Sequence, residues 1–361
     1  MTSVPDLVVL GGGIAGLTSA LAAAARGMRV TVIDQPRSGA ASRASAGLLA
    51  PSIAGLPEWV RAIALEARDM YPRFLAALLD RTDVVVALDR NGILELATSE
   101  ADLEERAARM GRSAERLDAR ALTALEPAFS THPGAVLHPH DGAVDTVTLM
   151  AVLDIAVARQ SRITRVTDEV ASFDARGNLP AFRSRGGARY GSRRLLVAGG
   201  AWAGLLPGLP RSLPVRPVRG QLLRLAGLPI RHVTHTSDGY LVPRAGTVIV
   251  GATSEDAGFE CATTPRGLAA LRAIATRAIP VLGHAPLTEH WAGLRPMTPD
   301  GLPVLGADPA LPALCYACGF SRNGILLAPW AAEQLAPVLA GSEPSPSLSG
   351  FGVDRFDRPA S

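Results

Sequence analysis

LVVLGGGIAGLTSALAAAARGMRVTVID, residues 7–34, decides the fold of this chain. The apolar run 7–10 predicts a buried strand, residues 11–16 form a glycine-rich turn, and residues 17–26 predict a helix. A second apolar strand follows at residues 30–33. Strand, turn, helix and strand in this order form one right-handed βαβ unit, the building block of a Rossmann-like parallel sheet.

The glycine turn carries the pattern G-x-G-x-x-G on Gly11, Gly13 and Gly16. Glycine lets the backbone approach a pyrophosphate at the N-terminus of the helix, where free amide groups attract an anion. Asp34 closes the second strand about 20 residues later, where its carboxylate can accept hydrogen bonds from an adenosine ribose. The sequence therefore predicts a dinucleotide site. A merely structural turn is the weaker account, because strand, helix and acid would have to coincide by chance.

NAD and FAD share this motif, and two further stretches favour a long cofactor. Residues 40–51 are rich in small side chains, and the buried strand 195–198 runs into Gly199 and Gly200. Both stretches suit close approach of the backbone to an extended ligand, although each also fits an ordinary loop. No second G-x-G-x-x-G occurs in the sequence. A reductase with paired FAD and nicotinamide motifs is therefore disfavoured, and electrons are expected to come from an organic substrate.

Composition excludes several other classes of protein. The chain has 361 residues, is 48% hydrophobic and carries 36 Lys+Arg positions, every one of which is arginine. A P-loop and a pyridoxal phosphate enzyme both need a lysine, so neither is expected. The net charge of +3 gives no reason to expect a nucleic-acid partner, and the basic stretch 183–194 predicts a solvated hairpin.

The apolar stretches, the N-terminal residues and the cysteines favour a cytoplasmic protein. The longest uncharged helical stretch, residues 14–25, is shorter than the ~20 apolar residues of a membrane span. Residues 1–6 carry no basic side chain, so no secretory signal is expected. Cys315 and Cys318 lie three apart in a strand-like run and are expected to be buried free thiols on opposite faces. The loop histidines His132, His138 and His140 lack metal-site spacing, and no metal is expected.

The rest of the chain divides into two kinds of pattern. A long helix is expected over 58–80, alternation typical of a strand at 84–88, and short β runs between 215 and 253. A strand at 313–317 and a helix at 324–339 return to the α/β pattern. The expected fold is therefore α/β (α+β overall), with a discontinuous Rossmann-like domain and a substrate domain on an antiparallel sheet. The segments are 1–80, 145–212 and 290–361 for the first domain, and 81–144 and 213–289 for the second.

Two further motifs carry a resemblance to a known family: WAGLRPMTPDGLPVLG at 291–306 and RNGILLAP at 322–329. Together with the glycine turn, they make the chain resemble the glycine oxidase (ThiO) branch of the D-amino acid oxidase family of FAD-dependent oxidoreductases. The resemblance spans nearly the whole chain. Its other segments are 41–51, 217–221, 240–244, 250–255 and 319–321.

The resemblance implies FAD as the cofactor of the Rossmann-like domain. Binding is expected to be non-covalent, because Met297 stands where covalent relatives carry a cysteine. Val170 is expected to touch the adenine through its backbone. The cofactor-binding residues that the resemblance implies are Gly11, Gly13, Ile14, Ala15, Gly16, Asp34, Gln35, Ala41, Ser42, Ala46, Gly47, Leu48, Val170, Gly199, Gly200, Trp202, Phe320, Ser321, Arg322, Asn323, Gly324, Ile325 and Leu326.

The resemblance also implies the reaction. Arg295 and Tyr240 would bind the carboxylate of glycine or a similar small amino acid, and Arg322 would take the amine on its backbone carbonyl. Hydride would pass from the amine-bearing carbon to flavin N5, with no side chain acting as base. The products would be an imine and, after reoxidation by O2, H2O2. A role in thiamine thiazole synthesis and a homo-oligomer are expectations from the same resemblance.

Some residues depart from the family pattern, and other activities stay open. Phe320 and Ser321 replace a histidine and an aromatic residue, while Asp238 and Ser254 occupy expected pocket positions and are equally well explained as ordinary loop residues. One alternative is a D-amino acid or sarcosine-type dehydrogenase that passes electrons to an acceptor other than O2. Another is a flavin-binding subunit that is silent until it joins a hetero-oligomer.

Overall fold

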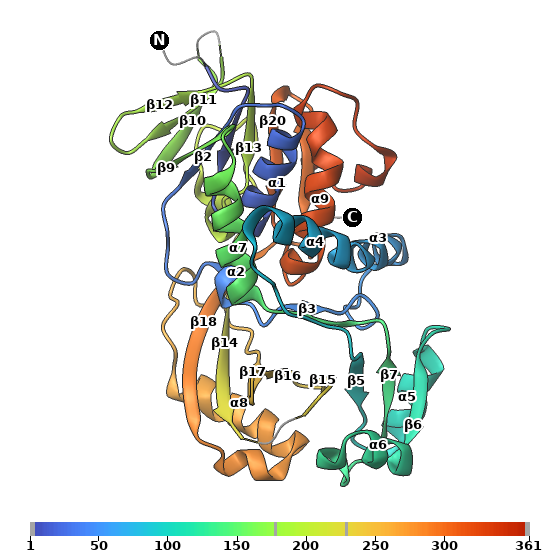
Figure 1. The fold of residues 1–361 in the computed structure, drawn as a ribbon. Coiled ribbons are helices and arrows are strands. Elements are labelled where there is room, and N and C mark those ends of the chain that lie inside the picture. The colour runs from blue at the N-terminus through green and yellow to red at the C-terminus, as the bar shows by residue number, and fades with distance from the viewer. Residues whose placement is uncertain (1–3, 177–178, 228–229, 358–361) are drawn as a thin grey trace.

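Two large sheets dominate the computed structural model, which describes residues 4–176, 179–227 and 230–357. Figure 1 shows one sheet in the upper half among helices α1, α7 and α9, and the other in the lower half beside helix α8. The outermost residues of the expected Rossmann-like segments, 1–3 and 358–361, lie outside the described residues.

The upper sheet has six strands in the order β19-β20-β13-β1-β2-β9. All neighbours run parallel except β19, which pairs antiparallel with β20. Because β1 and β2 are parallel and joined by helix α1 (Ile14–Ala25), the expected βαβ unit is confirmed. The strands are β1 (Leu7–Leu10), β2 (Val30–Asp34), β9 (Ile163–Thr167), β13 (Arg194–Val197), β19 (Val304–Asp308) and β20 (Leu311–Cys318).

Apolar side chains cover both faces of this sheet. On one face, Leu17 of α1 and Trp330 of α9 (Gly324–Leu339) pack in a core that also includes α7 (Thr146–Arg159) and α3 (Glu58–Asp69). On the other face lie Phe173 and Phe182 of a small sheet. That sheet consists of β10 (Val170–Asp174), β11 (Ala181–Ser184) and β12 (Arg189–Gly191).

The two buried cysteines of β20 follow the prediction made from their spacing. Cys315 belongs to the helix-side core and Cys318 to the core on the opposite face, and both are free thiols. Burial raises the pKa of each thiol to about 12. The two side chains therefore serve as small apolar residues.

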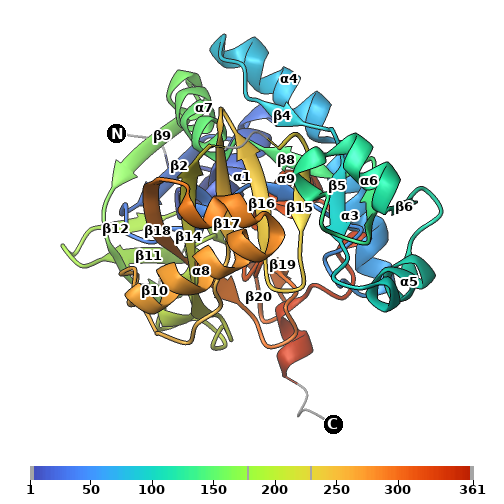
Figure 2. The same cartoon turned by 90° about the horizontal axis from the view of Figure 1, so that it is seen from below.

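The lower sheet has eight strands in the order β18-β14-β17-β16-β15-β5-β7-β6 (Figures 1 and 2). Helices α8 (Pro265–Ala278) and α6 (Ala119–Leu125) pack on one face, and the other face turns toward the upper half. The strands are β5 (Ile93–Leu96), β6 (Glu115–Asp118), β7 (Gly134–His138), β14 (Arg216–Ala226), β15 (Val233–His235), β16 (Tyr240–Arg244), β17 (Thr247–Gly251) and β18 (Leu287–Met297).

Three local expectations were wrong. The helix expected over 58–80 is two helices, α3 and α4 (Tyr71–Thr82), because Pro72 lacks an amide donor and starts a new first turn. The strand expected at 84–88 shrinks to β4 (Leu88–Asp89), which joins β3 (Leu48–Leu49) and β8 (Gly142–Val144) in a small sheet. The expected histidine loop contains strand β7, which ends at His138, and this side chain is buried.

Two of the expected domain limits fall inside elements. Residue 80 lies within α4, and residue 290 lies within β18, which pairs with β14 along most of its length. The division of the chain into two domains stays a prediction. The long pairing of β18 with β14 has a clear consequence for the site, since it places the arginine of the GLRP sequence on the lower sheet.

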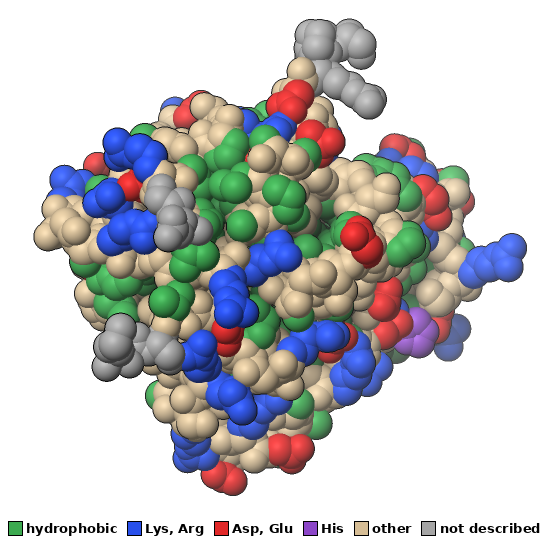
Figure 3. Space-filling model, turned by 90° about the horizontal axis from the view of Figure 1, so that it is seen from above, with side chains coloured by type: hydrophobic (Ala, Val, Ile, Leu, Met, Phe, Trp, Pro, Cys, Tyr) green, Lys and Arg blue, Asp and Glu red, His purple; other side chains and the backbone are tan. Residues whose placement is uncertain are grey.

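The surface agrees with the modest net charge. The basic stretch 183–194 includes the β11–β12 hairpin, in which Arg183 pairs with Asp174. Figure 3 shows arginine side chains interspersed with acidic and uncharged ones on the face seen from above. None of the helices within the described ranges combines the length and apolarity that a membrane crossing requires.

Candidate functional site

A cavity of about 1030 Å³ is lined both by the carboxyl-terminal side of the upper sheet and by the open face of the lower sheet. Most of the cofactor-binding residues expected from the sequence line it. These are Gly11, Gly13, Ile14, Ala15, Asp34, Gln35, Ala41, Ser42, Leu48, Val170, Gly199, Gly200, Trp202, Phe320, Ser321, Arg322, Asn323, Gly324 and Ile325. The two expected carboxylate-binding residues, Tyr240 and Arg295, line the same cavity.

The glycine turn before α1 is as tight as the motif predicts. Gly11 has a φ of +115°, and a Cβ there would lie 2.3 Å from the carbonyl oxygen of Ala198. A Cβ on Gly16 would lie 1.9 Å from the carbonyl oxygen of Gly11. Only glycine fits these positions. The amide of Ile14, at the start of α1, donates to Oγ of Ser42 at 3.1 Å, so the short helix α2 (Ala41–Ala44) is tied to the N-terminus of α1.

Asp34 lies beside the same turn. A Cβ on Gly12 would lie 2.6 Å from Oδ2 of Asp34, so the absence of a side chain at residue 12 makes room for this carboxylate. Asp34 is the last residue of β2 and lines the cavity. The helix N-terminus and the carboxylate therefore lie at the positions where the motif predicts a pyrophosphate and a ribose hydroxyl of one ligand.

Four of the expected cofactor residues do not line the cavity. Gly16 packs against Gly11, and Leu326 is buried in the helix-side core. Ala46 accepts a hydrogen bond from Arg244 at 3.0 Å on its carbonyl oxygen. Gly47 lies so close to β8 that a Cβ would be 2.0 Å from the carbonyl oxygen of Val144. These four residues pack outside the residues that line the cavity.

The segment before α9 crosses the cavity in a constrained conformation. Ser321 has a φ of +53°, in the left-handed region that costs a non-glycine residue about 1 kcal/mol or more. Its amide donates to the carbonyl oxygen of Pro296 at 2.9 Å, which fixes the segment to β18. Helix α9 begins at Gly324, as expected, with Asn323 to Ile325 in the cavity wall. The exposed guanidinium of Arg322 has no partner among the described residues.

Arg295 reaches the cavity from β18 and lies over the backbone of β14. A Cβ on Gly220 would lie 2.3–2.4 Å from three atoms of the Arg295 guanidinium. Nη1 donates to the carbonyl oxygen of Thr253 at 2.9 Å, and within the described part of the chain the other N–H groups have no partner. Glu255 does not neutralise it directly, because its carboxylate is bonded to Arg219, Gln221 and Thr253.

Tyr240 lies beside Arg295 in the cavity. Its ring crosses Gly251, where a Cβ would lie 2.5 Å from the phenolic oxygen. Burial raises the pKa of Tyr240, against the opposing charges of Arg295 and Arg322. Burial lowers the pKa of Arg295. The charge of Arg322 acts in the same direction, and Tyr240 opposes it. Arginine stays charged in proteins, so the pair presents a cation and a neutral hydroxyl donor to a ligand.

Comparison with known proteins identifies the family. The family model described as "FAD dependent oxidoreductase" matches residues 6–337.

The chain belongs to the FAD-dependent oxidoreductase family.

Individual relatives show which members of this FAD-dependent family the chain is similar to. The chain is 34% identical to the bifunctional protein ThiO/ThiG of Trichormus variabilis over 99% of its own length, and spans 56% of that protein. It is 31% identical to a glycine oxidase of Pseudomonas aeruginosa, with 94% of this chain and 95% of that one covered. The crystal structure of a glycine oxidase from Geobacillus kaustophilus superposes with a TM-score of 0.92 at 28% identity, covering 98% and 99% of the two chains. The expected resemblance to the glycine oxidase branch is confirmed.

FAD is the cofactor of this family, and the cavity fits it. The tight glycine turn, the Asp34 carboxylate beside Gly12 and the N-terminus of α1 all line one cavity. The described residues contain no group of three or more His, Cys, Asp or Glu side chains placed to hold a metal ion. In this family, FAD supplies the redox chemistry.

The cavity also contains residues that the sequence did not single out. Gly220, Thr253 and His235 line it, and only the first two fall in segments that carry the family resemblance. His235 has no sequence signal, because its position depends on β15 pairing with the distant strand β5. Asp238 lines the rim but is about half exposed and paired with Arg277, so it is not a buried carboxylate. Ser254 is an exposed lining residue.

Proposed function

We propose that this FAD-dependent protein oxidises the amine of glycine or a similarly small amino acid. The observation that carries the proposal is the pair Arg295 and Tyr240, whose hydrogen-bond donors face the cavity that also contains the glycine turn. When bound, the flavin supplies the acceptor for a hydride from the amine-bearing carbon, which leaves an imine. The glycine oxidases among the relatives support this substrate class.

Arg295 and Tyr240 bind the substrate carboxylate in this account. Two free N–H groups of a guanidinium can donate in parallel to both carboxylate oxygens, an arrangement that is strong and directional. Tyr240 adds a third donor because its raised pKa keeps the phenol protonated. Gly220 and Gly251 leave the space in which both side chains lie. The carboxylate is thereby placed at the lower sheet, with the amine-bearing carbon directed toward the flavin.

Arg322 and the N-terminus of α9 act at the other side of the substrate. The carbonyl oxygen of Arg322 accepts a hydrogen bond from the amine, and the left-handed Ser321 fixes the direction of this segment. The N-terminal end of α9 carries a partial positive charge toward the cavity. That charge stabilises negative charge on a bound, reduced cofactor. No side chain is required as a base in this account.

Further expectations belong to the same proposal. We expect O2 to be the electron acceptor and H2O2 its product, FAD to be held without a covalent bond, and the chain to form a homo-oligomer in the cytoplasm. The bifunctional ThiO/ThiG proteins among the relatives support a supply of imine for thiamine thiazole synthesis. No nucleic-acid partner is included, in line with the small net charge.

Anaerobic titration of the flavin-loaded protein tests the proposal. Glycine, sarcosine and small D-amino acids are added in turn, flavin absorbance is followed, and air is then admitted. Bleaching by glycine, followed by recolouring and peroxide in air, is the expected result. Bleaching without recolouring, reversed by an added quinone, would favour the dehydrogenase alternative. A protein that bleaches with none of these amines would contradict the proposed substrate class.

A further inference from the structure

His235 lies in the cavity wall one strand beyond Tyr240. Four strands of the lower sheet place residues in one row, in the register Gly251↔Tyr240↔His235↔Glu95. Neighbours in such a row share a face of the sheet, about 5 Å apart. His235 and Tyr240 line the cavity, so the row extends the carboxylate-binding surface away from Arg295.

The imidazole of His235 is polar but unsatisfied. Nδ1 is buried and has no hydrogen-bond partner, and Nε2 likewise has none among the described residues. A buried polar atom without a partner costs about 1–3 kcal/mol, so proteins seldom leave one unpaired without a function. Nε2 is not one of the buried atoms, so in a residue that lines the cavity it is the ring nitrogen that a bound molecule can reach.

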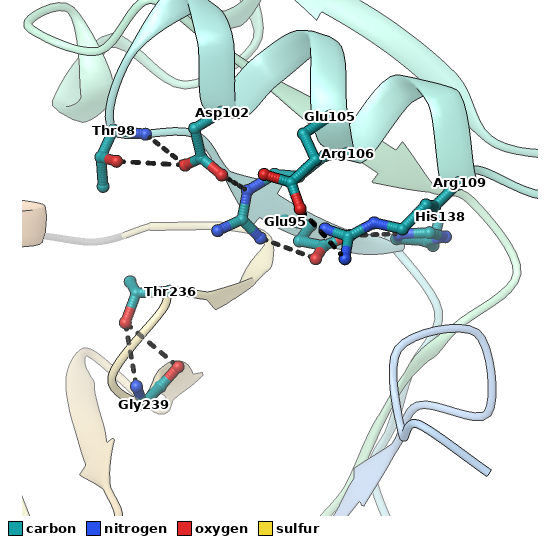
Figure 4. A network of polar contacts seen from close by, with 9 residues as sticks. All are labelled: Glu95, Thr98, Asp102, Glu105, Arg106, Arg109, His138, Thr236 and Gly239. Atoms are coloured by element: carbon teal, nitrogen blue, oxygen red, sulfur yellow. Dashed lines mark hydrogen bonds and ion pairs between the residues drawn. The ribbon is translucent and has the colours of Figure 1, made fainter.

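The charged residues beside His235 bond to one another and leave its ring nitrogens unpaired. Glu95 accepts a hydrogen bond from Arg106 at 2.6 Å and lies 3.3 Å from Nε2 of His138, and Arg106 also donates to Asp102 at 2.8 Å (Figure 4). In the turn that follows His235, Thr236 Oγ1 donates to the carbonyl oxygen of Gly239 and accepts a hydrogen bond from its amide, which fixes the connection between β15 and β16. Glu95 is therefore engaged by other residues.

The charges around His235 favour a neutral ring. Burial is the main cause that lowers its pKa, with Arg106, His138 and Arg322 acting in the same direction and Glu95 opposing them. Tyr240, on the strand to the other side, stays a neutral phenol. A neutral imidazole has one donor and one acceptor nitrogen, so it can bond a hydroxyl group or donate to a carboxylate.

We propose that His235 is a specificity-determining residue that hydrogen-bonds a hydroxyl or carboxylate group carried by the substrate on its α-carbon or its nitrogen. The favoured substrates are then small amino acids with a second polar group, preferred over hydrocarbon analogues of the same size. This inference rests on the proposed function, because it assumes that the carboxylate binds between Arg295 and Tyr240. Sites built to bond a polar group discriminate strongly against analogues that lack it.

Two substrate pairs test the inference, each differing in one polar group. D-serine against D-alanine tests the α-carbon, and iminodiacetate against sarcosine tests the nitrogen. Wild type is expected to prefer the polar member of at least one pair in kcat/KM, and His235→Leu to lower that preference about tenfold. His235→Gln, whose amide donates and accepts, should keep most of it. His284→Gln, at an exposed histidine, should keep all of it.

Binding of unreactive acids separates this inference from the proposed function. D-glycerate and D-lactate differ by the same hydroxyl as serine and alanine, and their binding is followed by the change in flavin absorbance. An unchanged preference in His235→Leu, by turnover and by binding, would overturn the role of His235. Wild type without preference for either polar substrate would also overturn it. Failure of every amine to bleach the flavin would instead contradict the proposed function, while the glycerate and lactate comparison would still test His235.

Discussion

The guanidinium of Arg295 lies over the backbone of Gly220, so close that a Cβ at residue 220 would be 2.3 Å from Nη2. The two residues belong to the paired strands β18 and β14, where Arg295 is opposite Val218, two residues from Gly220. Their proximity means that the direction of the Arg295 side chain depends on the absence of a side chain at position 220. A substitution at Gly220 should therefore alter substrate binding although Arg295 itself is unchanged.

Gly220→Ala tests this relationship. The new methyl group displaces a flexible guanidinium, so the chain should fold and retain FAD, while KM for glycine rises by at least about tenfold. Steady-state kinetics and the flavin spectrum of the purified variant measure both effects. Gly186→Ala is the matched control, because its Cβ would meet no atom closer than 3.8 Å. Equal KM values in the two variants would show that Gly220 does not position Arg295.

Asp34→Asn tests the cofactor end of the cavity. Loss of the charged acceptor should weaken FAD binding about 10- to 100-fold, since hydrogen bonds to charged groups contribute about 1.5–3 kcal/mol. Titration of the apoprotein with FAD, followed by quenching of flavin fluorescence, gives the affinity. Asp80→Asn, at an exposed aspartate of α4, should leave the affinity unchanged. Wild-type affinity in Asp34→Asn would exclude a ribose contact at this residue.

Asp141→Asn should destabilise the fold. The Asp141 carboxylate is fully buried, lies 2.8 Å from Nη1 of Arg68 and accepts hydrogen bonds from Ser52, whose loop continues into the cavity-lining residue Ile53. Removing one charge of a buried pair is expected to lower the free energy of unfolding by about 3 kcal/mol. Asp69→Asn removes an exposed partner of the same arginine and should cost less than about 1 kcal/mol. Urea unfolding of the two variants measures the loss of unfolding free energy, and equal losses would contradict the prediction.

Acid should destabilise the protein partly through His235. Its pKa in the folded protein is lowered, mainly by burial, from the ordinary value near 6.5. As the pH falls below about 6.5, the unfolded chain binds a proton that the folded chain resists, so stability is lost. Between pH 7.5 and pH 5, wild type should therefore lose more unfolding free energy than His235→Gln, which has no titrating group at this position. A difference that is independent of pH would show that the folded pKa is not lowered.

Thiol labelling checks the packing of β20. The chain has three cysteines, of which Cys261 is partly exposed while Cys315 and Cys318 are buried, with pKa values raised to about 12. Reactivity requires an accessible thiolate. Mass spectrometry after treatment of the native protein with iodoacetamide should find the label on Cys261 alone, and on all three residues in denaturant. Rapid native labelling of Cys315 would contradict the packing of the upper sheet.

Local signals in the sequence predicted much of the upper half of the molecule. The glycine turn, the terminal acid of β2 and the start of α9 follow from short motifs, because each depends on residues that are neighbours in the chain. The helix break at Met70 was not predicted, because the helical pattern of residues 58–80 continues across Pro72, which lies in the first turn of α4. His235 could not be predicted, because a parallel pairing between β5 and β15 brings it beside Glu95 from far along the chain. Long-range strand pairing of this kind leaves no periodic signal.

Anaerobic reduction of the flavin by glycine, compared between wild type and Arg295→Met, tests whether Arg295 binds the substrate carboxylate. Methionine keeps length and apolar packing but cannot bind a carboxylate. Glycine should bleach the wild-type flavin, whereas the variant should retain its flavin but bleach at least about 100-fold more slowly at the same glycine concentration. Bleaching of both proteins at the same rate, or of neither, would contradict this prediction.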